Sequence, residues 1–259
     1  MDAVLSGKVV LVTGGAGAIG FEICAQALEA GATVVVNSRK QDRCEAAVAR
    51  LLQRVPGAQA LAMAADTTDY AACVQLVADI EARAGRLDGV VHCAVSAPHG
   101  VTGKFEQTDP AQYPALMVQS ICNLMNICHA ALPALKRAGG GSIVAFSSDA
   151  GKVAAPNQTM IGSTRAAAMM FIRSLALEAS AHNVRCNCVS PTFVKDTPVY
   201  DYIMDQDPAF GRAARATSRA KLGLPTPGEL AALTLFLCGP GSAHMTGQVI
   251  SVNGGLNAA

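Results

Sequence analysis

Tryptophan is absent from this 259-residue chain, and aromatic residues make up only 4% of it. Charged residues are also few, at 15%, and they nearly balance to a formal net charge of +1. Nothing here resembles the basic surface interleaved with aromatics that binds nucleic acid, or the positive charge that attracts anionic membranes. We therefore expect neither partner. Hydrophobic residues reach 51%, enough for a sizeable buried core.

Export and membrane signals are lacking as well. The opening MDAVLSGKVVLVTGG has no basic segment followed by an apolar run, and no stretch reaches the roughly 18 apolar residues of a membrane span. The nine cysteines form no CxxC pair and lie in apolar segments. We expect buried thiols in a reducing compartment rather than disulfides or metal ligands, and a cytoplasmic protein without a metal site.

Short β-branched runs alternate along the chain with longer helical segments. The expected strands are residues 8–13, 33–37, 58–65, 87–93, 142–147, 184–189 and 248–252. The main expected helices are residues 18–30, 110–136, 157–181 and 228–237. This alternation predicts an α/β fold of the Rossmann type, a doubly wound sheet of about seven parallel strands with helices on both faces. No linker of biased composition divides residues 1–259, so we expect a single domain.

A glycine-rich turn follows the first expected strand. Residues 13–20 read TGGAGAIG and open the first expected helix. Glycines at this place let the backbone turn tightly and approach a pyrophosphate, which then lies at the helix N-terminus. Tight turns need glycine in any case, but the position in the first βαβ unit favours a dinucleotide site.

Several segments together resemble the short-chain dehydrogenase/reductase family over nearly the whole chain. TGGAGAIG is similar to the family's TGxxxGxG, with Ala18 in place of the middle glycine. Further similar segments are ADTTD at residues 65–69, GGGSIVAFSS at 139–148, SLALE at 174–178, NVRCNCVSP at 183–191 and TGQVISVNGG at 246–255. The resemblance implies that a nicotinamide dinucleotide contacts Gly14, Gly17, Ile19, Gly20, Asp66, Thr67, Ala94, Pro191 and Val194.

The end of the second expected strand bears on the type of dinucleotide. Asn37 is followed by Ser38 and Arg39, with no acidic residue to bind the adenosine ribose and repel a 2′-phosphate. Arg39 can pair with that phosphate, although a solvated loop arginine is the alternative. We expect NADP(H) rather than NAD(H). The nicotinamide side departs from the family, since Val95 and Thr192 stand where the family has glycine.

The family's catalytic residues are only partly present. The resemblance implies a carbonyl-polarising serine at Ser148, but the family's tyrosine is replaced by Ile161 and its lysine by Arg165. The family's asparagine falls at Ser120. Isoleucine carries no proton, and arginine keeps the positive charge without relaying protons. Ser148, Arg165 and Ser120 are therefore the candidate catalytic residues, with Arg165 also expected to hold the nicotinamide ribose.

Three functions compete on this pattern. The first is an NADP(H)-dependent oxidoreductase with a non-standard proton source, acting on a small or medium apolar carbonyl or a conjugated enoyl compound. The second is a catalytically inactive protein that binds NADP(H) or a partner. The third is non-redox chemistry of the halohydrin dehalogenase kind, which is disfavoured because those proteins keep the tyrosine and lose the nucleotide loop.

Other polar and aromatic groups are weaker candidates. They are Tyr113, His99 and Lys152, and, in an expected substrate lid at about residues 192–222, Tyr200, Tyr202, Met204 and Phe210. The lid composition favours an apolar ligand, and core packing explains it equally well. The resemblance also implies that the helices at 110–136 and 157–181 form a four-helix dimer interface within a homotetramer.

Overall fold

Seven parallel strands form one sheet, as predicted, in the computed structural model, which describes residues 4–95, 99–206 and 218–258. The strand order is β3-β2-β1-β4-β5-β6-β7. The strands are β1 (Val9–Thr13), β2 (Thr33–Ser38), β3 (Ala60–Ala64), β4 (Gly89–His92), β5 (Gly141–Phe146), β6 (Val184–Pro191) and β7 (Val249–Val252). The order reverses between β1 and β4, the point at which open α/β sheets bind ligands beyond the strand ends.

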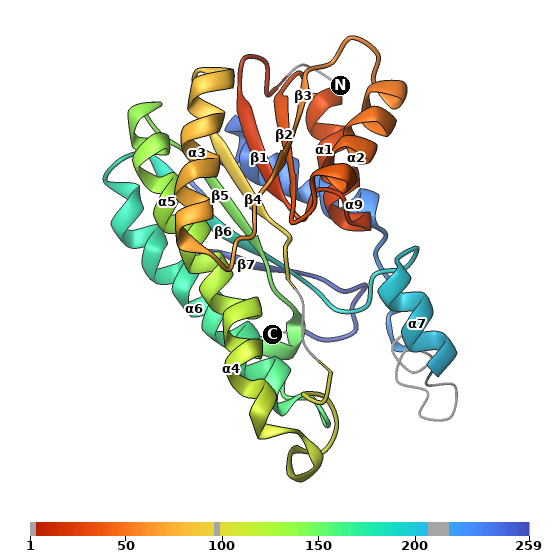
Figure 1. The fold of residues 1–259 in the computed structure, drawn as a ribbon. Helices are drawn as coiled ribbons and strands as arrows, with labels where there is room; N and C mark the ends of the chain where they lie inside the picture. The colour runs from red at the N-terminus through yellow and green to blue at the C-terminus, as the bar shows by residue number, and fades with distance from the viewer. Residues whose placement is uncertain (1–3, 96–98, 207–217, 259) are drawn as a thin grey trace.

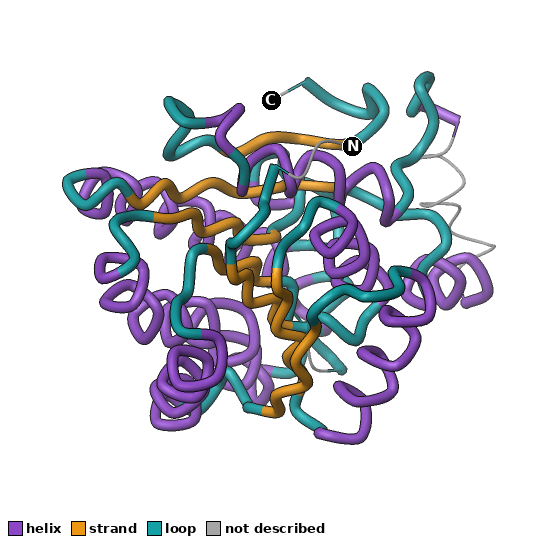
Figure 2. The backbone as a smooth tube through the Cα atoms, turned by 90° about the horizontal axis from the view of Figure 1, so that it is seen from above, coloured by secondary structure: helices purple, strands orange, loops and turns teal. Residues whose placement is uncertain are grey.

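Helices cover both faces of this sheet (Figures 1 and 2). One layer consists of α1 (Ala18–Glu29), α2 (Gln41–Arg54) and α9 (Pro227–Cys238). The other consists of α3 (Tyr70–Ala84), α5 (Asn123–Arg137) and α6 (Thr159–Ser180). The short helices α4 (Tyr113–Met117) and α7 (Pro198–Gln206) lie beyond the carboxyl ends of the strands.

The strand sequences explain the two layers. In β1, Val9 and Leu11 pack into the core under α3, α5 and α6, whereas Val10 and Val12 pack into the core under α1, α2 and α9. A strand buried on both faces reads as a continuous apolar run, which is why VVLVT shows no alternation. The nine cysteines are all free thiols, as predicted, but only six of them are buried, and Cys93, Cys122 and Cys238 are half-buried.

The long helix expected at residues 110–136 is interrupted. A 3₁₀ turn (Pro110–Gln112) leads into α4, and a π-helical turn, η3 (Val118–Cys122), separates α4 from α5. The extra residue of a π turn is invisible to a 3.6-residue pattern. The second long helix starts at Thr159 rather than at residue 157, because Asn157 adopts a positive φ of 65°.

Helix length and composition would allow Pro110–Arg137 to cross a membrane. Half of its most apolar window is buried inside the fold, however. Packing against the sheet therefore accounts for its apolar composition.

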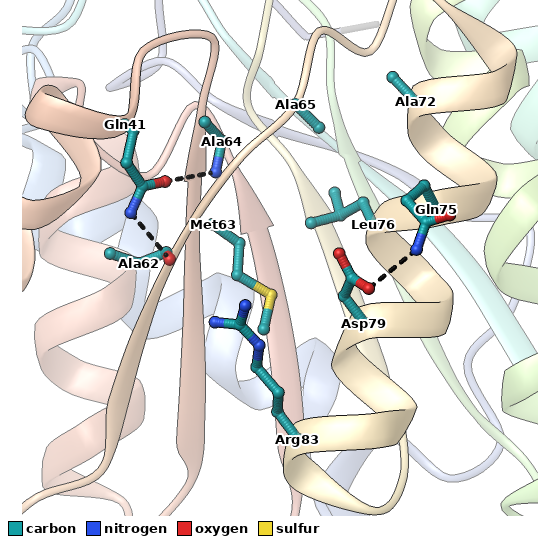
Figure 3. A pocket seen from close by; sticks show the side chains of 10 residues that line it. All are labelled: Gln41, Ala62, Met63, Ala64, Ala65, Ala72, Gln75, Leu76, Asp79 and Arg83. Carbon is teal, nitrogen blue, oxygen red and sulfur yellow. Dashed lines mark hydrogen bonds between the residues drawn. The ribbon is translucent and has the colours of Figure 1, made fainter.

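Strand β3 lies at one edge of the sheet, and Gln41 covers its open side (Figure 3). The Gln41 Oε1 accepts the Ala64 N–H at 3.0 Å, and the Gln41 Nε2 donates to the Ala62 carbonyl at 3.3 Å. A hollow between β3 and α3, lined among others by Leu76 and Arg83, lies beside these contacts. It is at the sheet edge and is not lined by the candidate catalytic residues.

Candidate active site

The glycine-rich turn after β1 packs too tightly for side chains. A Cβ on Gly14, whose φ is 71°, would lie 2.9 Å from the Ala94 nitrogen. A Cβ on Gly20 would clash with the Gly14 carbonyl oxygen. Gly17 caps α1 without a side-chain hydrogen bond, and no acidic residue occupies the first helical turn. The first-turn N–H groups near Ile19 and the positive end of the helix dipole therefore suit an anion such as a pyrophosphate.

The ends of β2 and β3 form the side where an adenosine would lie. The Asn37 amide nitrogen is buried and donates to the carbonyls of Met63 at 3.0 Å and Ala65 at 3.3 Å, so this side chain links the two strands. Ser38 is half-buried, and Arg39 is exposed. The exposed positive charges that follow β2 are consequently those of Arg39 and Lys40.

The loop after β3 is fixed from two sides. One Asp66 carboxylate oxygen accepts hydrogen bonds from the Thr68 amide at 2.9 Å and the Thr68 hydroxyl at 2.8 Å. The Asn126 amide on α5 donates to the carbonyls of Thr67 and Thr68, both at 3.1 Å. The loop is thereby held against α5, which fixes both predicted adenine-side residues, Asp66 and Thr67.

At the end of β4, His92 is only 1% exposed. Its Nδ1 is 2.9 Å from the Thr13 hydroxyl, and its Nε2 has no partner within the described residues. Burial first, and then the positive charge of Arg165, lower the His92 pKa to about 4, so the ring is neutral at neutral pH. His92 is thus a buried, neutral polar group close to the candidate site, and the sequence motifs did not identify it as a site residue.

Asn123 is a second group that the sequence did not single out. It follows Ser120 by one helical turn, and its amide nitrogen donates to the Ala94 carbonyl at 2.6 Å. This bond holds the backbone after β4 against α5. An asparagine within an apolar helical stretch was the only available signal.

Ser148 follows the end of β5 by two residues and precedes a short turn, η4 (Asp149–Gly151). The turn packs on the backbone of α6, because a Cβ on Gly151 would lie 2.6 Å from the Ala166 nitrogen, and one on Gly162 would lie 2.7 Å from the Ala150 carbonyl oxygen. The Ser147 hydroxyl also donates to the Arg165 carbonyl at 3.0 Å. These contacts fix Ser148 next to the first two turns of α6.

Arg165 is the charged group on that part of α6. It is 9% exposed, and no carboxylate pairs with it in the described part of the chain. Burial lowers its pKa to about 10, which leaves the guanidinium charged at neutral pH. One turn earlier, Ile161 packs against an apolar cluster of Val101, Leu116 and Met160. A buried cation therefore lies beside an apolar side chain rather than beside an acid.

The remaining predicted residues approach the same region from η3 and β6. Ser120 is buried in η3, which packs against α6. Pro191 ends β6, and Val194 is buried shortly beyond it. Between them, the Thr192 hydroxyl is buried and has no partner among the described residues.

The alternative proton donors are engaged elsewhere or exposed. The Thr108 hydroxyl donates to the Phe105 carbonyl at 2.7 Å, so the Tyr113 hydroxyl, 2.6 Å away, donates to Thr108. Lys152 contacts β7, and His99 and Tyr202 are exposed. Phe210 and most of the second half of the expected lid lie outside the described residues.

These residues fit a nicotinamide dinucleotide. Four features offer polar or open positions where such a molecule would lie: the glycine turn at the switch point, the N-terminus of α1 without a side-chain cap, the Thr192 hydroxyl and Arg165, the last two without a partner among the described residues. Together, the doubly wound sheet and this site define a dinucleotide-binding protein.

Comparison with known proteins gives the family. The family described as "Enoyl-(Acyl carrier protein) reductase" matches residues 14–257. A tropinone reductase homolog of Arabidopsis thaliana is 30% identical over 252 residues, 97% of this chain and 92% of the relative. A 3-oxoacyl-(acyl-carrier-protein) reductase of Chlamydia trachomatis is 28% identical over 258 residues, 99% of this chain and all of the relative.

Solved structures agree. A short-chain type dehydrogenase/reductase from Mycobacterium ulcerans has a TM-score of 0.90 at 28% identity, covering 99% of this chain and 91% of that one. A 7α-hydroxysteroid dehydrogenase solved with NADH and 7-oxo glycochenodeoxycholic acid has a TM-score of 0.87 at 26% identity, covering 98% and 96%. The chain belongs to the short-chain dehydrogenase/reductase family, whose members are oxidoreductases that bind a nicotinamide cofactor.

Proposed function

We propose that this protein is an NADP(H)-dependent oxidoreductase that works without a tyrosine acid. One observation carries the proposal: Arg165 is buried, charged and unpaired by any described carboxylate, on a helix against which the Ser148 turn is packed. Maintaining a buried cation without a counter-ion is costly, so such a group favours a site where negative charge develops on a ligand.

Ser148 and Arg165 divide the work on the substrate oxygen. A dinucleotide bound beside them would supply or accept the hydride. Ser148 Oγ accepts the Ala150 N–H at a long 3.4 Å, which leaves its hydroxyl proton for donation to a carbonyl oxygen. The Arg165 charge stabilises the negative charge that develops on that oxygen. The final proton comes from water or from Ser148, because arginine does not release its own proton.

The substrate class follows from this weak acid assistance. Activated ketones and conjugated enoyl compounds accept hydride with less help from a proton donor than simple ketones do. Ile161 and its apolar neighbours suit a small or medium apolar substrate beside the reacting oxygen. The curated relatives named as a 3-oxoacyl reductase and a tropinone reductase homolog are in keeping with a carbonyl substrate.

The preference for NADP(H) rests on the end of β2. Asn37 turns its side chain to the backbone of β3, and the exposed Arg39 and Lys40 follow the strand. A guanidinium there favours a 2′-phosphate. Calorimetric titration should give tighter binding of NADPH than of NADH, and Arg39→Ala should remove most of the difference.

The decisive experiment combines binding with turnover. NADPH consumption should be measured over carbonyl, quinone and enoyl-thioester substrates for the wild type, Arg165→Met and the exposed control Arg173→Met on the same helix. The proposal is supported if Arg165→Met loses turnover while Arg173→Met retains it. NADPH binding without turnover on any substrate indicates an inactive binding protein instead. Gain of simple carbonyl reduction in Ile161→Tyr with Arg165→Lys tests the rest of the site.

For assembly, we propose a homotetramer. The outer faces of α5 and α6 expose Met125, Met170 and Leu177, the last at 78% exposure, beside a groove that includes Phe171 and Leu175. A run of exposed apolar side chains on two neighbouring helices favours burial against a second copy. Light scattering after size exclusion tests the mass. A cytoplasmic location stays a prediction.

A further inference from the structure

The turn that carries Ser148 also carries a buried carboxylate that the reaction does not use. Asp149 is 2% exposed and accepts three side-chain hydrogen bonds. Its Oδ1 accepts the Ser190 hydroxyl and the Ser251 hydroxyl, both at 2.7 Å, and its Oδ2 accepts the Asn253 amide at 2.6 Å. One side chain thus joins the end of β5 to the ends of β6 and β7.

Lys152 completes this arrangement at the other end of the turn. Its Nζ donates to the Val249 carbonyl at 2.8 Å and to the Ser251 hydroxyl at 2.9 Å. Since the single proton of that hydroxyl goes to Asp149, Ser251 accepts from the lysine and donates to the carboxylate. The two charges of the turn are therefore joined through one hydroxyl, which satisfies both within the fold.

The position of Ser190 connects this cluster with the residues that are expected to lie beside the nicotinamide. Ser190 directly precedes Pro191 and Thr192, and Asp149 directly follows Ser148. The hydrogen bond between Ser190 and Asp149 therefore ties the residue after Ser148 to the residue before Pro191. On the opposite side, Gly151 already touches the α6 backbone, so a loosened turn would move away from α6 and from Arg165.

We infer that Asp149 is a positioning residue. By linking η4 to β6, it fixes the position of Ser148 relative to Pro191 and Thr192. This inference rests on the proposed dinucleotide site, and it adds to that proposal a residue that touches neither substrate nor cofactor. A neutral side chain of the same size cannot accept hydrogen bonds from three donors, so the position of Ser148 relative to β6 depends on the carboxylate.

The test compares Asp149→Asn with Asp88→Asn. Asp88 is also buried and accepts hydrogen bonds from Lys8, Arg86 and the Val9 amide, but it directly precedes β4, at the amino-terminal ends of the strands, whereas the site lies at their carboxyl ends. Both variants therefore lose a buried carboxylate, and only one is next to the site. Ser190→Ala removes a single bond of the cluster and serves if Asp149→Asn does not fold.

Binding should be measured with NADPH and with its fragment 2′,5′-ADP, which lacks the nicotinamide. Asp149→Asn should weaken NADPH about tenfold, the effect of one hydrogen bond to a charged group, and leave the fragment within about twofold. It should also shift the emission of bound NADPH, which no tryptophan obscures in this chain. Asp88→Asn should leave both affinities unchanged. Equal weakening of both ligands, or the same result from Asp88→Asn, overturns the inference.

A second readout separates this inference from the proposed function. If the wild type binds no NADPH, the proposed function fails, and amide hydrogen exchange then decides on Asp149. Faster exchange in both residues 148–151 and residues 192–194 of Asp149→Asn, absent from Asp88→Asn, supports the link. Unchanged exchange in residues 192–194 refutes it.

Discussion

One side chain through which acidification should weaken the folded state is His92. Its ring is almost fully buried at the end of β4, with one nitrogen bonded to Thr13 and the other unpartnered among the described residues. Burial and the Arg165 charge lower its pKa from 6.5 to about 4. Over this interval the unfolded chain binds a proton that the folded chain does not bind, so stability falls as pH falls.

The magnitude follows from the two pKa values. The free energy of unfolding is unaffected by His92 protonation above the pKa of the unfolded chain, and it decreases as the pH falls toward the folded pKa of about 4. Between about pH 7 and about pH 4.5, His92 should cost about 2 to 3 kcal/mol of the free energy of unfolding. Because His92 is almost fully buried, solvent does not screen this effect appreciably.

Urea unfolding followed by far-ultraviolet circular dichroism measures this term. The wild type and His92→Asn are compared at each pH, because the difference cancels the other titrating groups. The stability gap should shift by about 2 to 3 kcal/mol in favour of His92→Asn at the acid end. A gap that stays constant with pH refutes the reasoning. In Arg165→Met, nuclear magnetic resonance should show the His92 pKa raised toward its ordinary value.

Three further results are expected. Gly20→Ala forces a methyl group against the Gly14 carbonyl, so NADPH affinity should fall at least about tenfold, whereas Gly228→Ala, with its nearest neighbour at 3.7 Å, should bind normally in calorimetry. Arg39→Glu should invert the preference between NADPH and NADH, as measured by the ratio of their dissociation constants. Leu177→Glu should lower the oligomer mass in light scattering while the melting temperature of the protomer stays nearly unchanged, because this side chain is exposed there.

The strands and most helices could be predicted because each depends on local sequence. The π turn could not, since a single extra residue leaves the apolar pattern almost unaltered. The candidate residues at strand ends, Ser148 among them, followed from motif spacing. The Asp149 cluster joins residues 41 to 104 positions apart, and neither short motifs nor periodicity contain such separations. The direction of the Asn37 side chain likewise depends on a neighbouring strand.

Gln41 has a consequence for how these molecules behave at high concentration. An exposed edge strand offers unpaired backbone groups to any other extended chain and is a common origin of aggregation. By bonding to both Ala62 and Ala64, the Gln41 amide occupies the place of an incoming strand. One side chain on α2 thus protects β3 against edge-to-edge association without a charge.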